Sequence, residues 1–190
     1  MARALIDSKC IIFGDFILKS GMKSPIYIDL RKITGNPILY NLVIETYIDR
    51  INSLDFDALI GIPMAGLPIV SAIAIKEAIP MCYIRSSKNY GTKNEFEGGV
   101  ISGSKVLIVD DLVTRGTSVI KVLPKIKNKY QTESMLVLID RESGGKSLLE
   151  SHGIKLESIF TLTELLIFWK NNNLISNNEY KYSIEFISRD

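Results

Sequence analysis

Apolar positions along the chain alternate between the spacing of buried strands and the spacing of amphipathic helices. Short runs rich in β-branched residues predict strands at residues 57–62, 81–85, 106–109, 135–139 and 156–160. Helical periodicity predicts helices at residues 36–54, 68–77, 119–130, 145–152 and about 161–170. About five alternations of strand and helix predict an α/β fold with a roughly five-stranded parallel sheet and helices on both faces.

The two ends of the chain and one internal stretch depart from this alternation. Residues 1–35 contain a short helical pattern at 2–9 and strand-like alternation at 24–30, but no strand–helix unit, which predicts a small N-terminal hood. The amide-rich tail from residue 171 shows weak alternation at 180–187 and is a possible contributor to that hood. We expect a single domain of 190 residues whose core spans about 36–170.

Residues 86–99 are polar, contain glycine and show no periodicity. A stretch of this length without structure inside a compact domain usually has a function, for instance as a lid. We therefore expect a mobile loop there.

Composition narrows the class of protein. The chain is 46% hydrophobic and 23% charged, and its net charge is only +2, which gives no reason to expect nucleic acid or a membrane as a partner. The basic run at residues 121–129 fits the solvated face of a helix. The uncharged run at residues 58–75 is interrupted by two prolines and two glycines, which favours a strand, a loop and a helix over a membrane span.

Two reactive residue types, cysteine and histidine, are scarce. Cys10 and Cys82 stand far apart in apolar surroundings and are typical of small core residues in a reducing compartment. His152 is the single histidine and precedes Gly153, which indicates a helix cap and excludes a Ser-His-Asp triad or a histidine-based metal site.

The N-terminus lacks a signal-peptide core, and we expect a cytoplasmic location.

The most informative stretch is residues 106–118, V-L-I-V-D-D-L-V-T-R-G-T-S. The strand is predicted to stop on Asp110 and Asp111, and a loop with Gly116 and three hydroxyl residues leads into a helix. Hydroxyls beside the free N–H groups of a helix N-terminus suit a phosphate, whereas the carboxylates suit hydroxyls, a metal or developing positive charge. Unless the acidic pair only caps the turn, this order of groups describes a sugar phosphate that becomes cationic as it reacts.

This segment resembles the phosphoribosyl-pyrophosphate (PRPP) motif of type I phosphoribosyltransferases. Three further segments resemble orotate phosphoribosyltransferase: the hood signature at residues 13–29, the catalytic loop at 85–99 and the L-I-D-R-E strand end at 138–142. The resemblance implies the type I fold and transfer of phosphoribosyl from PRPP to orotate. The products would be orotidine 5′-monophosphate, on the way to UMP, and pyrophosphate.

The resemblance also implies residue roles. Lys19 matches the hood lysine near orotate and pyrophosphate, Tyr27 and Ile28 match the orotate pocket, and Arg141 matches the arginine that binds the orotate carboxylate. Thr114 matches a position of the 5′-phosphate loop that also lies near orotate. The residues implied to bind PRPP are Arg85, Lys88, Tyr90, Asp110, Asp111, Leu112, Val113, Thr114, Arg115, Gly116, Thr117 and Ser118. The implied catalytic set is Lys19, Lys88, Asp110 and Asp111, and the pyrophosphate loop is Pro63, Met64, Ala65 and Gly66.

Magnesium is implied as the cofactor, held mainly by PRPP oxygens and without direct protein ligands. A homodimer is implied too, because Arg85, Lys88 and Tyr90 match residues that complete the neighbour's site. The sequence departs from the family pattern in several places. The loop after Arg85 is one residue shorter, and the second lysine usual beside that arginine is missing, with Ser86 near there. Tyr90 replaces the loop histidine, and Met64-Ala65 replaces an aromatic–lysine pair, so that loop is expected to bind mainly through backbone N–H groups. Transfer to another base and PRPP binding by a non-enzymatic regulator remain the alternatives.

Overall fold

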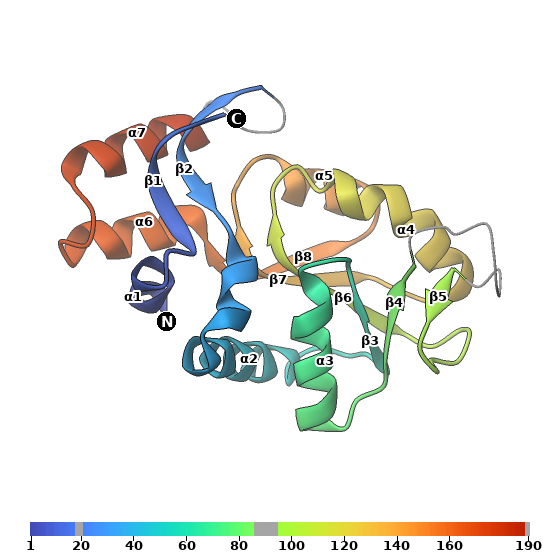
Figure 1. Ribbon diagram of the computed structural model, residues 1–190. Coiled ribbons are helices and arrows are strands. Elements are labelled where there is room, and N and C mark those ends of the chain that lie inside the picture. Colours follow the sequence, from blue (N-terminus) through green and yellow to red (C-terminus); the bar gives the residue numbers. More distant parts are fainter. Residues whose placement is uncertain (18–20, 86–94, 189–190) are drawn as a thin grey trace.

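The computed structural model describes residues 1–17, 21–85 and 95–188, and its centre is a six-stranded sheet (Figure 1). The strand order is β5-β4-β3-β6-β7-β8. The strands are β3 (Ala58–Gly61), β4 (Met81–Ile84), β5 (Phe96–Glu97), β6 (Val106–Val113), β7 (Ser134–Asp140) and β8 (Lys155–Thr161). Five of them pair in parallel and β5 pairs antiparallel with β4, which confirms the predicted parallel sheet.

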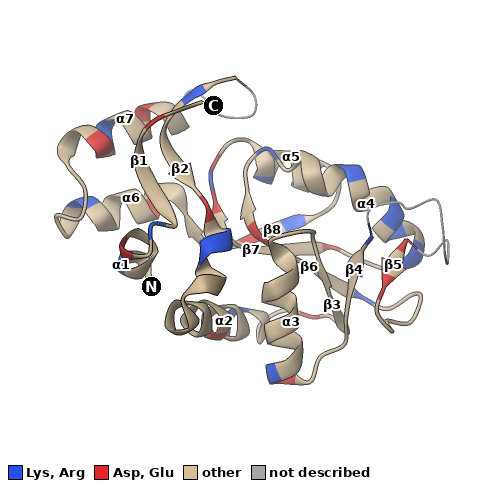
Figure 2. Cartoon of the chain, viewed as in Figure 1, with Lys and Arg blue, Asp and Glu red and all other residues tan. Residues whose placement is uncertain are grey.

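Helices cover both faces of the sheet (Figure 1). Side chains of a strand point alternately to its two faces, and the buried residues divide accordingly. Leu107 and Val109 of β6 belong to one apolar cluster together with α2 (Pro37–Ile51), α3 (Gly66–Glu77) and α6 (Leu162–Asn171). Ile108 belongs to a second cluster together with α4 (Thr117–Lys129) and α5 (Gly145–Ser151). Basic residues are spaced along α4 (Figure 2), and Lys121, Lys125 and Lys127 are exposed, as predicted for a solvated face, while Lys129 is half-buried.

The N-terminal segment forms a separate layer beside the sheet (Figure 1). Helix α1 (Ala2–Asp7) precedes the antiparallel pair β1 (Ile11–Ile17) and β2 (Lys23–Ile28), and the 3₁₀ helix η1 (Leu30–Gly35) leads into α2. The indole N–H of Trp169 in α6 donates to the Ala2 carbonyl at 2.9 Å, which ties this layer to the C-terminal part of the chain.

The tail is helical, which corrects the strand-like alternation seen in the sequence. Helix α7 (Asn177–Ile187) begins with a capping box in which Ser176 and Glu179 satisfy each other's backbone N–H groups. The serine and the glutamate three residues later are the sequence signal for a helix start, and the weak alternation further along the tail drew attention away from it. Helix α7 packs against β2 and so becomes part of the hood layer.

Two boundaries near the predicted site also differ from expectation. Strand β6 does not stop at the acidic pair but continues to Val113, because Asp110 pairs with Val137 and Val113 with Asp140 on β7. The predicted loop at residues 86–99 contains the short strand β5, whose Phe96 is buried against Tyr130. Among residues 1–17, 21–85 and 95–188, no helix has the length and hydrophobicity that a membrane crossing needs.

Candidate active site

The acidic pair lies in the last half of β6, in the middle of the sheet. The Tyr47 hydroxyl donates to the Asp110 carbonyl at 2.7 Å, and the Asp111 backbone N–H donates to the Asp110 carboxylate at 2.9 Å. Both carboxylates are partly buried. The fold therefore holds two adjacent acids in fixed positions at the carboxyl edge of the sheet, where ligands of such sheets bind.

Burial makes this pair costly to ionise. Desolvation, and then the charge of Asp111, raise the pKa of Asp110 to about 8. Desolvation also raises the pKa of Asp111, although its hydrogen bond with Asp110 and the charge of Arg31 oppose the shift. A ligand that donates hydroxyl hydrogens, or brings positive charge, would stabilise the ionised pair.

This burial predicts that the acidic pair lowers stability at high pH. The folded chain holds a proton on Asp110 that the unfolded chain loses above about pH 4, so the free energy of unfolding falls as pH rises toward 8. Asp110→Asn should therefore raise Tm at pH 8.5, by about 2–4 °C for each kcal/mol gained in a chain of this length, with a much smaller gain near pH 4.5. Thermal unfolding across this range measures it, with exposed Asp49→Asn as the control. A gain independent of pH would contradict the assignment.

A loop and a cavity adjoin the acidic pair. The Ile62 N–H donates to the Val109 carbonyl at 3.1 Å, and a Cβ on Gly66 would lie 2.6 Å from that same oxygen, so residues 62–66 pack directly on β6. A cavity of about 160 Å³ lies here. Its lining comes from η1, α2, the loop, α3 and β6, and comprises Leu30, Arg31, Ile33, Thr34, Tyr40, Val43, Met64, Ala65, Pro68, Ile69 and Asp111. The structure thus brings together Met64, Ala65 and Asp111.

The loop after β6 turns into α4 at Gly116, whose φ of +69° places it in the left-handed region that favours glycine. Helix α4 begins at Thr117, so the hydroxyls of Thr117 and Ser118 stand in its first turn, as the sequence predicts. Arg115 is exposed and Thr114 is half-buried. The first turn of α4 therefore has the N–H groups and hydroxyls that an anion site needs.

Gly145, at the start of α5, is a residue that sequence reasoning missed. A Cβ there would lie 2.3 Å from the Thr114 carbonyl and 2.9 Å from a methyl of Val113. Only a glycine allows α5 to approach the loop this closely. A glycine pair ahead of a helical pattern was the available signal, but it does not reveal which neighbour comes close.

Gly145→Ala should displace the loop at residues 114–118 and destabilise the fold by about 2 kcal/mol or more, because the nearest atom is backbone. Chemical denaturation would measure the loss, and affinity for a phosphate ligand should fall with it. Gly35→Ala is the matched control, since nothing lies within 4 Å of its new Cβ. Equal stability of the two variants would contradict the packing described.

Arg141 follows β7 and lies next to the same loop. Its backbone N–H donates to the Val113 carbonyl at 3.0 Å, and its Nε donates to the Ser143 hydroxyl at 2.9 Å. Its guanidinium carbon lies 5.5 Å from the centre of the Phe186 ring on α7. The C-terminal helix therefore helps to orient this arginine, a contact that the sequence did not predict.

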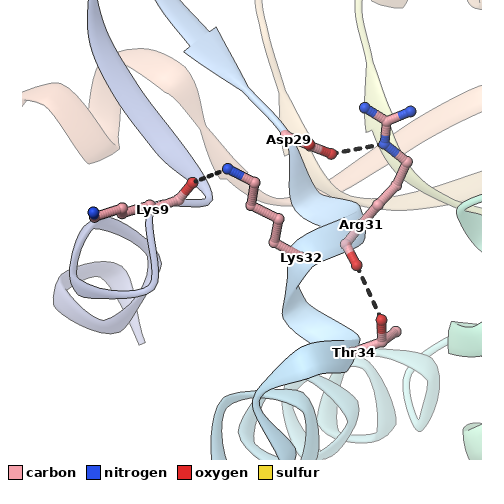
Figure 3. Close-up of polar contacts among 5 residues, drawn as sticks. All are labelled: Lys9, Asp29, Arg31, Lys32 and Thr34. Carbon is pink, nitrogen blue, oxygen red and sulfur yellow. Dashed lines mark hydrogen bonds and ion pairs between the residues drawn. The ribbon is translucent and has the colours of Figure 1, made fainter.

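The hood contributes Tyr27 and Ile28 at the end of β2. Tyr27 is partly exposed and its ring contacts that of Phe16, while Ile28 is half-buried. Arg31 follows on η1, and its Nε donates to the Asp29 carboxylate at 2.7 Å (Figure 3). This arginine lines the cavity described above and was not among the predicted site residues.

Arg85 stands apart from this group. It directly follows β4, which lies two strands away from β6, and its guanidinium pairs with Glu97 of β5 at 3.0 Å. Lys19, Lys88 and Tyr90 lie outside the described residues. The structure thus brings together the acidic pair, the loops at 63–66 and 114–118 and Arg141, but not Arg85.

Few side chains of the described residues could bind a metal ion at this site. Within the described parts of the chain, no group of three or more His, Cys, Asp or Glu could hold a metal. Asp110 and Asp111 are two carboxylates at the carboxyl edge of the sheet. Such a pair fits a magnesium ion that takes most of its oxygen ligands from a phosphate compound and from water.

Comparisons with known proteins agree with this arrangement. The sequence model of the phosphoribosyl transferase domain matches residues 30–152. The orotate phosphoribosyltransferase of Sulfolobus acidocaldarius is 36% identical, with 99% of this chain and 96% of that protein covered. The structure of Leishmania donovani UMP synthase has a TM-score of 0.91 at 36% identity, covering 100% of this chain and 42% of that one. Orotate phosphoribosyltransferase from Aeropyrum pernix has a TM-score of 0.77 at 32% identity, covering 89% and 98%. The chain belongs to the phosphoribosyltransferase family, among its orotate phosphoribosyltransferases.

Proposed function

We propose that the chain transfers the 5-phosphoribosyl group from PRPP to orotate, which yields orotidine 5′-monophosphate and pyrophosphate. The bond between ribose C1 and the pyrophosphate oxygen breaks, and a bond between C1 and the orotate ring nitrogen forms. That nitrogen loses its proton, and pyrophosphate leaves with the electron pair. The observation that carries this proposal is the meeting of Asp110–Asp111, the loop at residues 114–118 and Arg141 at the adjoining ends of β6 and β7.

The acidic pair has two tasks in this reaction. In the bound state Asp110 and Asp111 accept hydrogen bonds from the ribose hydroxyls. As pyrophosphate departs, the ribose ring gains positive charge, which nearby carboxylates stabilise. The partial burial that raises the pKa of both acids also strengthens this interaction, because water is excluded from around them.

The two loops and Arg141 each bind a different one of the remaining charged groups of the substrates. The first turn of α4, with Thr117 and Ser118, binds the 5′-phosphate. The backbone of residues 63–66 faces the pyrophosphate, and the Arg141 guanidinium takes the orotate carboxylate. An arginine suits this carboxylate because its planar donors match two oxygens at once. Tyr27 and Ile28 of β2 would cover the orotate ring.

A magnesium ion bound together with PRPP would neutralise charge on the pyrophosphate oxygens. Asp110 and Asp111 are the described residues that could face it. We also expect the residues outside the described ranges to take part, with Lys19 near orotate and Lys88 and Tyr90 on the loop that closes over the site. Arg85, Lys88 and Tyr90 would act on the neighbour in a homodimer, and the cytoplasm remains the expected location. The division into a hood at about 1–35, a core at about 36–170 and a loop at about 86–99 stays a proposal.

A panel of bases tests the substrate. The purified chain with PRPP and magnesium should release pyrophosphate with orotate, and at least 100-fold more slowly with uracil, adenine or hypoxanthine. Uracil is the sharpest comparison because it differs from orotate only in lacking the carboxylate. Faster release with a purine would favour transfer to another base. PRPP binding with no release for any base would favour a regulator.

A further inference from the structure

The loop at residues 63–66, which we expect to face the pyrophosphate, contains no basic side chain. The loop at residues 63–66 reads Pro-Met-Ala-Gly, and Met64 is 76% exposed. The nearest charged group that lines the adjoining cavity from β6 is Asp111, which is negative when ionised. A leaving group with several negative charges needs positive charge close to it, and this loop offers only backbone N–H groups.

Arg31 lines the same cavity as this loop. Leu30, Arg31, Ile33 and Thr34 of η1 line the cavity together with residues that include Met64, Ala65 and Asp111. The charge of Arg31 lowers the pKa of Asp111, so the guanidinium acts on the acidic pair through space. Arg31 is thus placed between the hood residue Tyr27, the loop at 63–66 and the end of β6.

The Arg31 side chain is held mainly by Asp29, and the Tyr27 side chain interacts with it more weakly. Asp29 accepts from Nε at 2.7 Å, and the two terminal nitrogens point beyond Asp29 (Figure 3). The side chain is 65% exposed. Lys32, the next residue, points to the opposite side, where its ammonium donates to the Lys9 carbonyl at 3.3 Å (Figure 3). One basic residue of η1 faces the cavity and its neighbour faces α1.

We propose, building on the function above, that Arg31 is a pyrophosphate-binding residue that supplies the positive charge missing from the loop at residues 63–66. Its two terminal N–H groups match neighbouring oxygens of a phosphate, and Asp29 holds the fork in place before the ligand arrives. Arg141 lies on the β7 side and takes the orotate carboxylate, so the two arginines serve different anions. As the bond to C1 breaks, Arg31 stabilises the growing charge on the departing oxygen.

Calorimetric titration with magnesium pyrophosphate tests the assignment without requiring turnover. Arg31→Gln should weaken pyrophosphate binding at least 10-fold, and Arg31→Lys should recover part of the loss. Lys32→Gln removes the same charge from the same turn, and its affinity should stay within about twofold of the wild type. Equal losses from Arg31→Gln and Lys32→Gln would overturn the proposal, as would unchanged binding in Arg31→Gln.

Asp29→Asn separates direct binding from a structural role of the ion pair. Arg31→Gln and Asp29→Asn both remove the pair, but only the first removes the cation that would face pyrophosphate. Direct binding predicts a much larger loss for Arg31→Gln, and equal losses would overturn it. In steady-state assays Arg31→Gln should raise the KM for PRPP while the KM for orotate changes less than threefold. If wild-type protein binds pyrophosphate through Arg31 yet consumes no orotate, the proposed function fails while this inference stands.

Discussion

Replacing Asp110 and Asp111 together by asparagine is expected to lower kcat by at least about 100-fold. The reason is that the two carboxylates face the ribose ring where positive charge develops, and removing one such electrostatic partner costs about 10²–10³ in other enzymes. Asparagine has nearly the size of aspartate and keeps a hydrogen-bond acceptor. The fall in kcat therefore reflects the lost charge more than a change of shape. Initial rates of orotate consumption at saturating PRPP measure the effect.

The acidic-pair variant has a built-in test of folding. Because burial raises the pKa of both acids, the double variant should be at least as stable as the wild type at pH 8. A chain that is more stable but much slower separates catalysis from folding. Exposed Asp49→Asn should match the wild-type rate. A double variant with nearly full kcat would contradict the role given to the pair.

The second large effect is expected at Arg141. Arg141→Ala should raise the KM for orotate about 100-fold or more, equal to about 2.7 kcal/mol, because the orotate carboxylate then lacks its charged partner. The KM for PRPP should change less than threefold, since the loop at residues 114–118 stays in place. Steady-state kinetics with each substrate varied in turn measures both values.

Graded replacements around Arg141 refine this prediction. Arg141→Lys keeps the charge without the planar fork and should fall between the wild type and Arg141→Ala. Phe186→Leu keeps an apolar residue on α7 but removes the ring beneath the guanidinium, and should raise the orotate KM by less than 10-fold. Equal increases in the KM for both substrates would contradict a specific carboxylate contact.

The order of elements could be predicted from the sequence because the apolar runs are short, β-branched and separated by clear helices. The helix predicted at about residues 161–170 is present as α6 and begins with a capping box of Thr161 and Glu164. The end of β6 was not predictable, since carboxylates do not belong in a strand by propensity and only pairing with β7 carries the strand to Val113. Tertiary partners, which the sequence pattern does not contain, decided this boundary.

Some residues of the candidate site could be predicted from the sequence and others could not. Residues in contiguous motifs, such as 110–118, could be found because strand, acids and hydroxyl loop follow one another in the chain. Gly145, Phe186 and Arg31 could not be found from the sequence. Gly145 and Phe186 contact residues that are distant in the chain, and Arg31 follows a turn whose direction the sequence does not determine. Their roles became visible only once the loop, α7 and η1 had positions in space.

The measurement that tests the central claim most directly is a paired assay with purified chain, orotate, PRPP and magnesium. The account predicts that the ultraviolet absorbance of orotate falls, that pyrophosphate appears in equal amount, and that both changes disappear in the Asp110→Asn/Asp111→Asn variant. Unchanged orotate absorbance in the wild type, with PRPP bound, would contradict the account.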